Sequence, residues 1–322
     1  MKVLITGCTG SLGSALLRHL LTNDLAERIV GYSRDEVKQA QLAQEVGDPQ
    51  PLRWVLGDVR DRDRLRRALW GCDAVIHCAA LKRVDRIAYD PNEAMLTNIM
   101  GSKNVVDCAI DAGVQRVLLI SSDKAVEPTN FYGMTKAVME GYGVTANVYG
   151  VPRGTRIAVG RWGNVLGSRG SVLLAWREAL AAGQPLPLTD SRCTRFWFTL
   201  PQAVAFALRC LAEMQGGELY VPKLPASRVM ALAQALSGPG VTPNVEVVGL
   251  RPGGEKLHET LISHEEVRRT HDLGWAYLVK PHVDFWRRHE WPGMPVGGLF
   301  VYRSDAARPA SVDELRALLE TA

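Results

Sequence analysis

The sequence lacks paired cysteines, long apolar runs and a strong excess of charge of either sign. Its six cysteines contain no C-x-x-C pair, which argues against a zinc site and against a disulfide framework. No apolar run approaches the ~20 residues that a membrane span needs, and the run after Lys2 is too short for a signal-peptide core. The 38 basic and 34 acidic side chains leave a net charge of +4, which gives no reason to expect a nucleic-acid partner. We therefore expect a cytoplasmic protein with reduced thiols, no metal site, and no membrane or nucleic-acid partner.

The composition is that of a globular protein with one large domain or two smaller ones. Its 322 residues are 47% hydrophobic and 22% charged. In the first half, short apolar runs alternate with helix-compatible stretches. These strand-like runs cover residues 3–6, 29–32, 54–56, 74–77, 117–120 and 157–159. Buried apolar strands that alternate with helices predict an α/β fold with a Rossmann-like, doubly wound parallel sheet.

The alternation of strands and helices changes after about residue 165. We predict loops at 167–170 and 186–190, a helix at 200–214, strands at 218–221 and 245–248, and a last helix that begins with a capping box at 311–314. We therefore expect a first domain at 1–165 and a smaller C-terminal lobe at 166–322. Some segments of this lobe are expected to return to the first sheet.

A glycine-rich loop follows the first strand-like run. Gly7, Gly10 and Gly13 are spaced as G-x-x-G-x-x-G, and the segment after them has helical apolar spacing. Glycines let the backbone turn tightly and approach a pyrophosphate, and the helix N-terminus offers N–H groups to the phosphates. A glycine triplet alone is often an ordinary turn, but here strand, spacing and helix agree. We therefore predict a dinucleotide site that includes Ser11 and Leu12 at the start of the helix.

The end of the second strand distinguishes the two nicotinamide dinucleotides. An acid there binds the ribose of NAD, whereas an arginine accepts the 2′-phosphate of NADP. Ser33 and Arg34 stand at this position and Lys38 follows one turn later, which favours NADP. The two acids that follow Arg34 keep NAD open as the alternative. Asp58, after the third strand, is placed to accept a hydrogen bond from the adenine amino group.

A tyrosine and a lysine stand four residues apart in a helix-compatible segment. Tyr132 and Lys136 would share one helix face, where the ammonium and an oxidised nicotinamide favour the phenolate. Tyr132 could then remove an alcohol proton during hydride transfer. Asp123 and Lys124 follow the fifth strand, and an extra acid and base suit elimination of water rather than simple alcohol oxidation. A solvated turn pair is the ordinary alternative for these two residues.

The glycine loop, the Tyr-x-x-x-Lys pair and a strand that ends in Ser121-Ser122 together resemble the extended short-chain dehydrogenase/reductase superfamily. Longer motifs resemble the inverting UDP-N-acetylglucosamine 4,6-dehydratases. These motifs cover residues 33–39, 79–84, 97–101, 120–125, 128–136, 161–165, 167–172, 194–200, 216–223 and 251–259. The resemblance therefore extends over nearly the whole chain.

The resemblance implies a redox-neutral reaction on UDP-N-acetylglucosamine with a tightly bound, recycled NADP. The sugar is oxidised at C4, water leaves across C5–C6, hydride returns to C6, and C5 is inverted. Ser122 would hydrogen-bond the substrate hydroxyl, and Tyr132 would take the 4-OH proton. Lys124 would remove the C5 proton, and Asp123 would protonate the leaving 6-OH. A base must be partly neutral, so we expect burial and the nearby Lys136 to lower the pKa of Lys124.

The resemblance also assigns the second lobe to the nucleotide sugar, because arginine forks suit a diphosphate. The predicted substrate-binding residues are Lys82, Asn164, Arg169, Thr189, Arg195, Arg251 and Glu255. The predicted cofactor-binding residues are Gly7, Gly10, Ser11, Leu12, Gly13, Ser33, Arg34, Lys38, Asp58, Val59, Ala79, Ala80, Lys82, Tyr132 and Lys136. The same resemblance implies a homo-oligomer of at least two chains.

The chain departs from the family's pattern near the predicted cofactor cleft. Ala88 stands where the family usually has glutamate, and Asp85-Arg86 replaces the usual proline-containing pair. These changes leave the sugar and the fate of C5 open. The alternatives are another nucleotide-sugar 4,6-dehydratase, a 4-epimerase or a non-catalytic NADP-binding sensor. The Asp123-Lys124 pair argues against an epimerase, because epimerisation at C4 needs no acid at O6.

Overall fold

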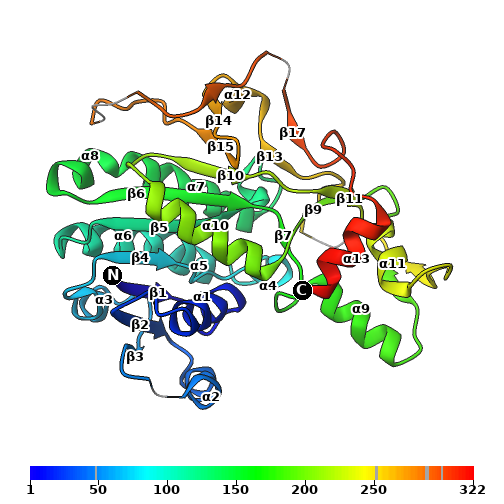
Figure 1. Ribbon diagram of the computed structural model, residues 1–322, viewed down its shortest axis with the longest axis horizontal. Helices are drawn as coiled ribbons and strands as arrows, with labels where there is room; N and C mark the ends of the chain where they lie inside the picture. The colour runs from blue at the N-terminus through cyan, green and yellow to red at the C-terminus, as the bar shows by residue number, and fades with distance from the viewer. Residues whose placement is uncertain (48, 251–252, 287–289, 299) are drawn as a thin grey trace.

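The computed structural model describes residues 1–47, 49–250, 253–286, 290–298 and 300–322. Within these residues a ten-stranded sheet runs through the molecule, with helices on both faces (Figure 1). Its strands, in spatial order, are β16 (Met294–Pro295), β14 (Thr270–Asp272), β15 (Ala276–Val279), β10 (Leu219–Pro222), β6 (Arg156–Trp162), β5 (Arg116–Ser122), β4 (Ala74–His77), β1 (Lys2–Thr6), β2 (Arg28–Ser33) and β3 (Leu52–Leu56). The strands from β10 to β3 are mutually parallel, and the other three extend the sheet with antiparallel pairings. The predicted Rossmann-like, doubly wound α/β fold is confirmed.

The helices of the parallel crossovers cover the two faces of this sheet. The helix α1 (Ser11–Thr22) packs on α10 (Leu200–Glu213), while α6 (Gly101–Asp111) contacts both α3 (Arg62–Leu69) and α7 (Phe131–Thr145). The further helices are α2 (Glu36–Val46), α4 (Val84–Ile87), α5 (Pro91–Ala94), α8 (Asn147–Gly150), α9 (Val172–Ala181), α11 (Val229–Ser237), α12 (His264–Val267) and α13 (Val312–Glu320), with 3-10 turns at Asp123–Ala125 and Val151–Arg153 and a π-helix at Met95–Met100. None of the helices in the described ranges has the length and apolarity that a bilayer-spanning segment needs.

Beyond residue 165 the chain contributes both to the large sheet and to a smaller lobe. In the lobe, β9 (Thr194–Phe198) lies between β7 (Asn164–Val165) and β11 (Ala226–Arg228), and α11 packs on α13. A second pair of strands joins β13 (Thr260–Ile262) to β17 (Tyr302–Arg303). The carboxyl ends of β5 and β6 face this lobe (Figure 1). In a doubly wound sheet, ligands bind at such an edge.

One predicted loop is wrong. Within residues 186–190, Leu186–Leu188 forms the strand β8, which pairs in parallel with β12 (Val245–Val247). Leu186 and Leu188 are buried and Pro187 between them is exposed. This alternation is too short to identify a strand, and a central proline argues against one. The partner strand, which comes much later in the chain, is what makes this segment a strand.

Candidate active site

The glycine loop connects β1 to α1 at the carboxyl edge of the sheet. Gly7 has a φ of 65°, and a Cβ at this position would lie 2.8 Å from the Ala79 backbone. A Cβ on Gly13 would lie 2.3 Å from the Gly7 carbonyl oxygen. Both positions therefore require glycine. The loop makes a close backbone cradle before Ser11, the first residue of α1, and this shape fits a dinucleotide pyrophosphate.

The loop between β7 and α9 closes over this cradle. The Arg169 N–H donates a hydrogen bond to Ser11 Oγ (2.9 Å). A hydrogen bond from Lys38 lowers the pKa of Asp35, and the Arg169 charge adds to this effect. Desolvation lowers the pKa of Lys82, again with a contribution from Arg169. Arg169, which was expected among the sugar ligands, therefore lies beside the predicted cofactor site, near Lys82.

At the end of β2, the acid next to Arg34 is already engaged. The Asp35 carboxylate caps α2 by accepting from the Lys38 N–H (3.0 Å), and it also pairs with the Lys38 ammonium. Arg34 is half exposed, and its Nη1 lies 3.5 Å from Asp58 Oδ2. Asp58 binds Arg60 more closely, at 2.7 Å. Arg34 is thus the more available group for a ribose substituent at this position.

The remaining predicted cofactor residues line the same edge of the sheet. Ser33 is buried at the end of β2, where its Oγ accepts a hydrogen bond from Gln39 Nε2 (3.0 Å). Val59 is buried after β3 and packs against Gly101 of α6, where a Cβ would come within 2.6 Å of its side chain. The half-buried members of the set are Leu12, Ala79 and Ala80.

The predicted acid and base stand where β5 ends. Ser122 Oγ donates to Asp123 Oδ1 (2.8 Å), and Lys124 Nζ donates to the same oxygen (3.0 Å). Asp123 is 1% exposed. Its second oxygen, Oδ2, is buried and has no hydrogen-bond partner in the described part of the chain. The three residues are therefore brought together in a site where Asp123 is buried and the Lys124 side chain is 26% exposed.

The helix α7 places Tyr132 and Lys136 against the end of β5. Gly133 permits this approach, because a Cβ there would lie 2.1 Å from the Lys124 carbonyl oxygen. Lys136 Nζ donates to the Ile120 carbonyl oxygen (2.7 Å). Both side chains are buried. The structure thus collects all five predicted reaction residues at one edge of the sheet.

The electrostatics of Tyr132 differ from the expectation. Burial raises the pKa of Tyr132 to about 12, against the opposing effects of the Lys124 charge and a hydrogen bond with Ser122. Burial lowers the pKa of Lys136 to about 8. The Lys124 charge favours the Tyr132 phenolate in this structure, but burial outweighs it.

The prediction of a lowered pKa for Lys124 is wrong. Burial opposes the ammonium charge, but the attraction of Asp123 and Glu259 outweighs burial and raises the pKa of Lys124 well above its usual value. Glu259 Oε1 lies 3.3 Å from Lys124 Nζ. The cation that opposes the charge here is Arg195 rather than Lys136. Two carboxylates therefore hold Lys124 as an ammonium ion.

The sequence does not predict that Glu259 lies at this site. It stands immediately before β13, is 2% exposed, and lies 135 residues after Lys124 in the chain. It is the last residue of the 251–259 motif, but nothing in that motif distinguishes a carboxylate of the reaction centre from one on the surface. The apolar residues that follow it in β13, Leu261 and Ile262, are the only local sign in the sequence that this segment is buried.

Two predicted substrate ligands, Arg195 and Glu255, bind each other. Arg195 Nη2 lies 2.9 Å from Glu255 Oε1. Arg195 Nη1 donates to the carbonyl oxygens of Thr194 (2.8 Å) and Leu257 (3.0 Å). Arg195 is 5% exposed and its Nε lies 3.9 Å from Glu259 Oε1. The pair therefore borders the reaction centre from the side of the smaller lobe.

Asn164, Thr189 and Arg251 complete the predicted substrate set. Asn164 lies in β7, and its Oδ1 is buried with no hydrogen-bond partner among the described residues. Thr189 follows β8, and its Oγ1 lies 3.9 Å from Cys193 Sγ. Arg251 lies outside the described residues.

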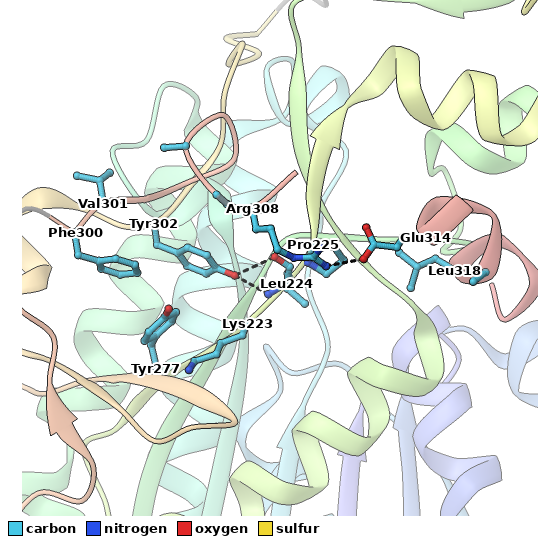
Figure 2. Close-up of a pocket in the computed structure, with 13 residues that line it drawn as sticks. Lys223, Leu224, Pro225, Tyr277, Phe300, Val301, Tyr302, Arg308, Glu314 and Leu318 are labelled. Atoms are coloured by element: carbon cyan, nitrogen blue, oxygen red, sulfur yellow. Dashed lines mark hydrogen bonds and ion pairs between the residues drawn. The ribbon is translucent and has the colours of Figure 1, made fainter. Parts of the chain in front are cut away.

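A separate pocket of about 830 Å³ lies in the smaller lobe between the segment after β10 and α13 (Figure 2). Tyr277, Phe300 and Tyr302 form one wall, with ring centroids 5.1–5.9 Å apart. Lys223 Nζ lies 4.9 Å from the centroid of the Tyr277 ring. None of the described cofactor or substrate residues lines this pocket. It is therefore distinct from the reaction centre.

Comparison with known proteins shows the family to which the chain belongs. The chain matches the family described as polysaccharide biosynthesis protein over residues 3–281. It is 41% identical over 287 residues to a UDP-N-acetylglucosamine 4,6-dehydratase (inverting) of Campylobacter jejuni, with 88% of this chain and 84% of that protein covered. It is 37% identical over 281 residues to a UDP-glucose 4-epimerase of Rickettsia bellii, with 86% and 82% covered.

A solved structure extends this likeness to the fold. The X-ray structure of Pen from Bacillus thuringiensis matches with a TM-score of 0.89 and 33% sequence identity, covering 99% of this chain and 96% of that one. The chain therefore belongs to the polysaccharide biosynthesis protein family of extended short-chain dehydrogenase/reductases, alongside the inverting UDP-N-acetylglucosamine 4,6-dehydratases.

Proposed function

We propose that the protein is a UDP-N-acetylglucosamine 4,6-dehydratase that inverts C5 and yields UDP-2-acetamido-2,6-dideoxy-β-L-arabino-hex-4-ulose. The observation that carries the proposal is the contact between Asp123 and Lys124 beside Tyr132. Oxidation at C4 alone needs only Ser122, Tyr132 and Lys136, so a further acid and base support proton transfers elsewhere on the sugar. The name of the Campylobacter relative describes the same reaction.

In this proposal the chain's own side chains carry the proton transfers. A nicotinamide cofactor supplies reversible storage of hydride when it is bound. Tyr132 takes the proton of the sugar 4-OH, and the resulting 4-ketone acidifies the C5 proton. Lys124 removes that proton, and Asp123 protonates the 6-OH, which leaves as water. A proton then returns to C5 on the opposite face.

The Asp123–Lys124 contact supplies a neutral base from a charged lysine. Lys124 Nζ and Asp123 Oδ1 are 3.0 Å apart. Transfer of one proton between them creates the neutral amine and the protonated carboxyl in the same step. The total charge of the pair does not change, so no proton needs to be exchanged with solvent. The raised pKa of Lys124 means that this transfer costs free energy, and Lys124 acts as a base only after its proton has moved to Asp123.

The proposed cofactor is NADP, held by residues 1–165, with most of residues 166–322 holding the nucleotide sugar. Arg34 is available for a 2′-phosphate, whereas Asp35 is engaged by Lys38. The hydrogen bond between Arg169 and Ser11 closes the glycine loop and supports a cofactor that stays bound through the cycle. We propose an assembly of at least two chains, as the family resemblance implies.

The test is incubation of the purified protein with UDP-N-acetylglucosamine in D₂O, followed by NMR of the sugar. We expect a 6-deoxy-4-keto product with deuterium at C5 and inverted configuration there. Deoxygenation with retained configuration would preserve the dehydratase and overturn the inversion. If this sugar and other nucleotide sugars stay unchanged while NADP binds, the protein is a sensor and the proposal is wrong.

A nucleotide-sugar 4-epimerase is the second candidate, favoured by the name of the Rickettsia bellii relative. Epimerisation needs oxidation and reduction at C4 only, and the C5–H bond stays intact. The same NMR experiment would then give a C4 epimer that retains its 6-OH and carries no deuterium at C5. The buried Asp123–Lys124 pair argues against this outcome, since C4 chemistry has no use for it.

A further inference from the structure

We propose that Glu140 is a positioning residue that keeps the buried Lys136 side chain charged as an ammonium ion at the reaction centre. This inference deepens the proposed function, because Lys136 is one of its reaction residues. Both residues belong to α7, and each is 5% exposed. They stand four residues apart, so they lie one turn apart on the buried helix face that also carries Tyr132.

The direct contacts of Lys136 carry no charge. Its Nζ donates to the Ile120 carbonyl oxygen at 2.7 Å and lies 3.5 Å from Met139 Sδ. These are its hydrogen bonds within the described ranges, and neither partner is a carboxylate. Burial disfavours an ammonium ion that has no ion-pair partner, so a lysine in such a place stays charged only where a nearby negative charge favours it.

The other titratable groups around Lys136 are neutral near pH 7. Burial raises the pKa of the Cys78 thiol to about 12 and that of the Tyr132 phenol to about 12. It lowers the pKa of the His77 imidazole to about 3. Burial also lowers the pKa of Lys136, but only to about 8, and the Glu140 carboxylate opposes this decrease. Glu140 therefore supplies the negative charge that favours the Lys136 ammonium.

Charged groups on the neighbouring elements lie at other turns of α7 or at the surface. Asp123 and Lys124 form an ion pair (3.0 Å) beside Tyr132, in the first turn of the helix. Asp107 of α6 binds Tyr142, six residues after Lys136. The further charged side chains of α4, α5 and α6 are partly or fully exposed, and they are Asp85, Arg86, Glu93, Lys103 and Asp111.

Arg161 of β6 holds Glu140 in place without neutralising it fully. Its guanidinium lies 2.9 Å from Glu140 Oε1 and 2.6 Å from Oε2, and it also binds Glu266 Oε1 at 2.8 Å. One guanidinium thus serves two carboxylates. The charge of Glu266 also acts on Arg269, whereas that of Glu140 acts on Lys136 of its own helix. Arg161 therefore fixes the Glu140 carboxylate one turn from Lys136, where a charge acts strongly because water is excluded.

The test is an NMR titration of Lys136 in the substrate-free protein, with isotope-labelled lysine side chains and the signal assigned by its loss in Lys136→Arg. Glu140→Gln keeps the size of the side chain, removes its charge, and leaves Arg161 paired with Glu266. We expect the pKa of Lys136 to fall by about one pH unit or more from its wild-type value. An unchanged pKa of Lys136 in the folded variant would overturn the role of Glu140.

Cofactor affinity provides a second readout, because Lys136 is a predicted cofactor-binding residue. The ammonium form favours the anionic cofactor, so a decrease of the Lys136 pKa from about 8 to about 7 should raise the Kd for NADP about threefold at pH 7.5. At pH 6 the Kd should stay nearly the same, since Lys136 is then charged in both proteins. Calorimetric titration at the two pH values measures this. Equal weakening at both values would indicate a structural defect and contradict the inference.

Glu266→Gln is the matched control, because it removes a carboxylate from the same guanidinium of Arg161. It should lower stability to a similar extent but lower the pKa of Lys136 less than Glu140→Gln does. Equal decreases in the two variants would assign the effect to the total charge of the triad and not to Glu140. If Glu140→Gln does not fold, Glu140→Met combined with Arg161→Met carries the titration, since apolar replacement of a whole buried ion pair is often tolerated. The pKa of Lys136 should fall in this double variant too.

The titration needs neither substrate nor turnover, so its outcome is separate from that of the proposed function. If the pKa of Lys136 falls in Glu140→Gln but the wild type forms no 6-deoxy product from any nucleotide sugar, Glu140 keeps its role towards Lys136 and the dehydratase is wrong. If the wild type forms the C5-deuterated product in D₂O and the pKa of Lys136 is the same in both proteins, the dehydratase stands and the role of Glu140 is wrong.

Discussion

Arg161 and Glu140 form a two-pronged ion pair inside the protein, with Nε 2.9 Å from Oε1 and Nη2 2.6 Å from Oε2. Glu266 binds the same guanidinium, with its Oε1 2.8 Å from Nη2. Arg161 Nη1 also donates to the carbonyl oxygen of Leu261 in β13 (2.9 Å). The guanidinium thus joins β6, the helix α7 of the reaction centre, and the strand that begins directly after Glu259.

Replacement of Arg161 should be strongly destabilising. Arg161→Met leaves Glu140 and Glu266 without their cation, and breaking a buried ion pair typically costs about 3–5 kcal/mol. Urea unfolding of the variant and the wild type measures this loss of unfolding free energy. Arg192→Met is the control, since Arg192 is exposed and its pair with Asp190 is expected to contribute little to stability. Equal losses in the two variants would contradict a role of the buried triad in stability.

Lys124→Ala should abolish dehydration and deuterium incorporation at C5 while nucleotide binding is retained. The variant has no base near C5, but it leaves the glycine loop and Arg34 unchanged. It also leaves Asp123 and Glu259 buried without their shared cation, so thermal unfolding must first show that the variant is folded. Incorporation of deuterium into C5 at the native rate would show that Lys124 is not the base.

Arg34→Ala should discriminate between the two nicotinamide dinucleotides. The variant loses the guanidinium available to a 2′-phosphate, so we expect the Kd for NADP to rise about 10- to 100-fold. The Kd for NAD should stay within about threefold, because NAD has no phosphate at this position. Isothermal titration calorimetry measures both constants. An equal increase in Kd for the two cofactors would show that Arg34 does not bind the 2′-phosphate.

His77 should make the protein less stable in acid. Its Nδ1 lies 2.7 Å from Thr6 Oγ1 and its Nε2 lies 2.9 Å from Ser102 Oγ. Burial, with a contribution from the Lys136 charge, lowers the pKa of His77 from 6.5 to about 3. The unfolded chain therefore binds a proton over this interval that the folded protein does not bind. The free energy of unfolding should fall by about 1.4 kcal/mol per pH unit as pH decreases from 6.5 towards 3.

The variant His77→Gln isolates this contribution, because the carboxylates that also titrate in acid are the same in both proteins. We expect a smaller slope of unfolding free energy against pH in the variant, measured by urea unfolding at several pH values between 6.5 and 3. Parallel slopes in the two proteins would assign the acid sensitivity to the carboxylates alone.

Features contained in one short segment were predictable. The glycine loop, the Asp123-Lys124 pair at the end of β5 and the Tyr132–Lys136 pair on α7 each depend on spacing along a single strand, turn or helix. In regular secondary structure, residues with such a spacing lie close together in space. The alternation of strands and helices predicted the doubly wound sheet for the same reason, since parallel strands need crossovers.

The sequence by itself thus determined the fold class, the glycine cradle and the residues that meet at the end of β5. Only the tertiary structure decided the charge of Lys124, because the second carboxylate beside it, Glu259, comes from 135 residues away. It also decided that Arg169 binds Ser11 and that residues 186–188 pair with the strand β12. Electrostatic energies depend on distance and burial, and spacing along the chain encodes neither for residues brought together from different elements.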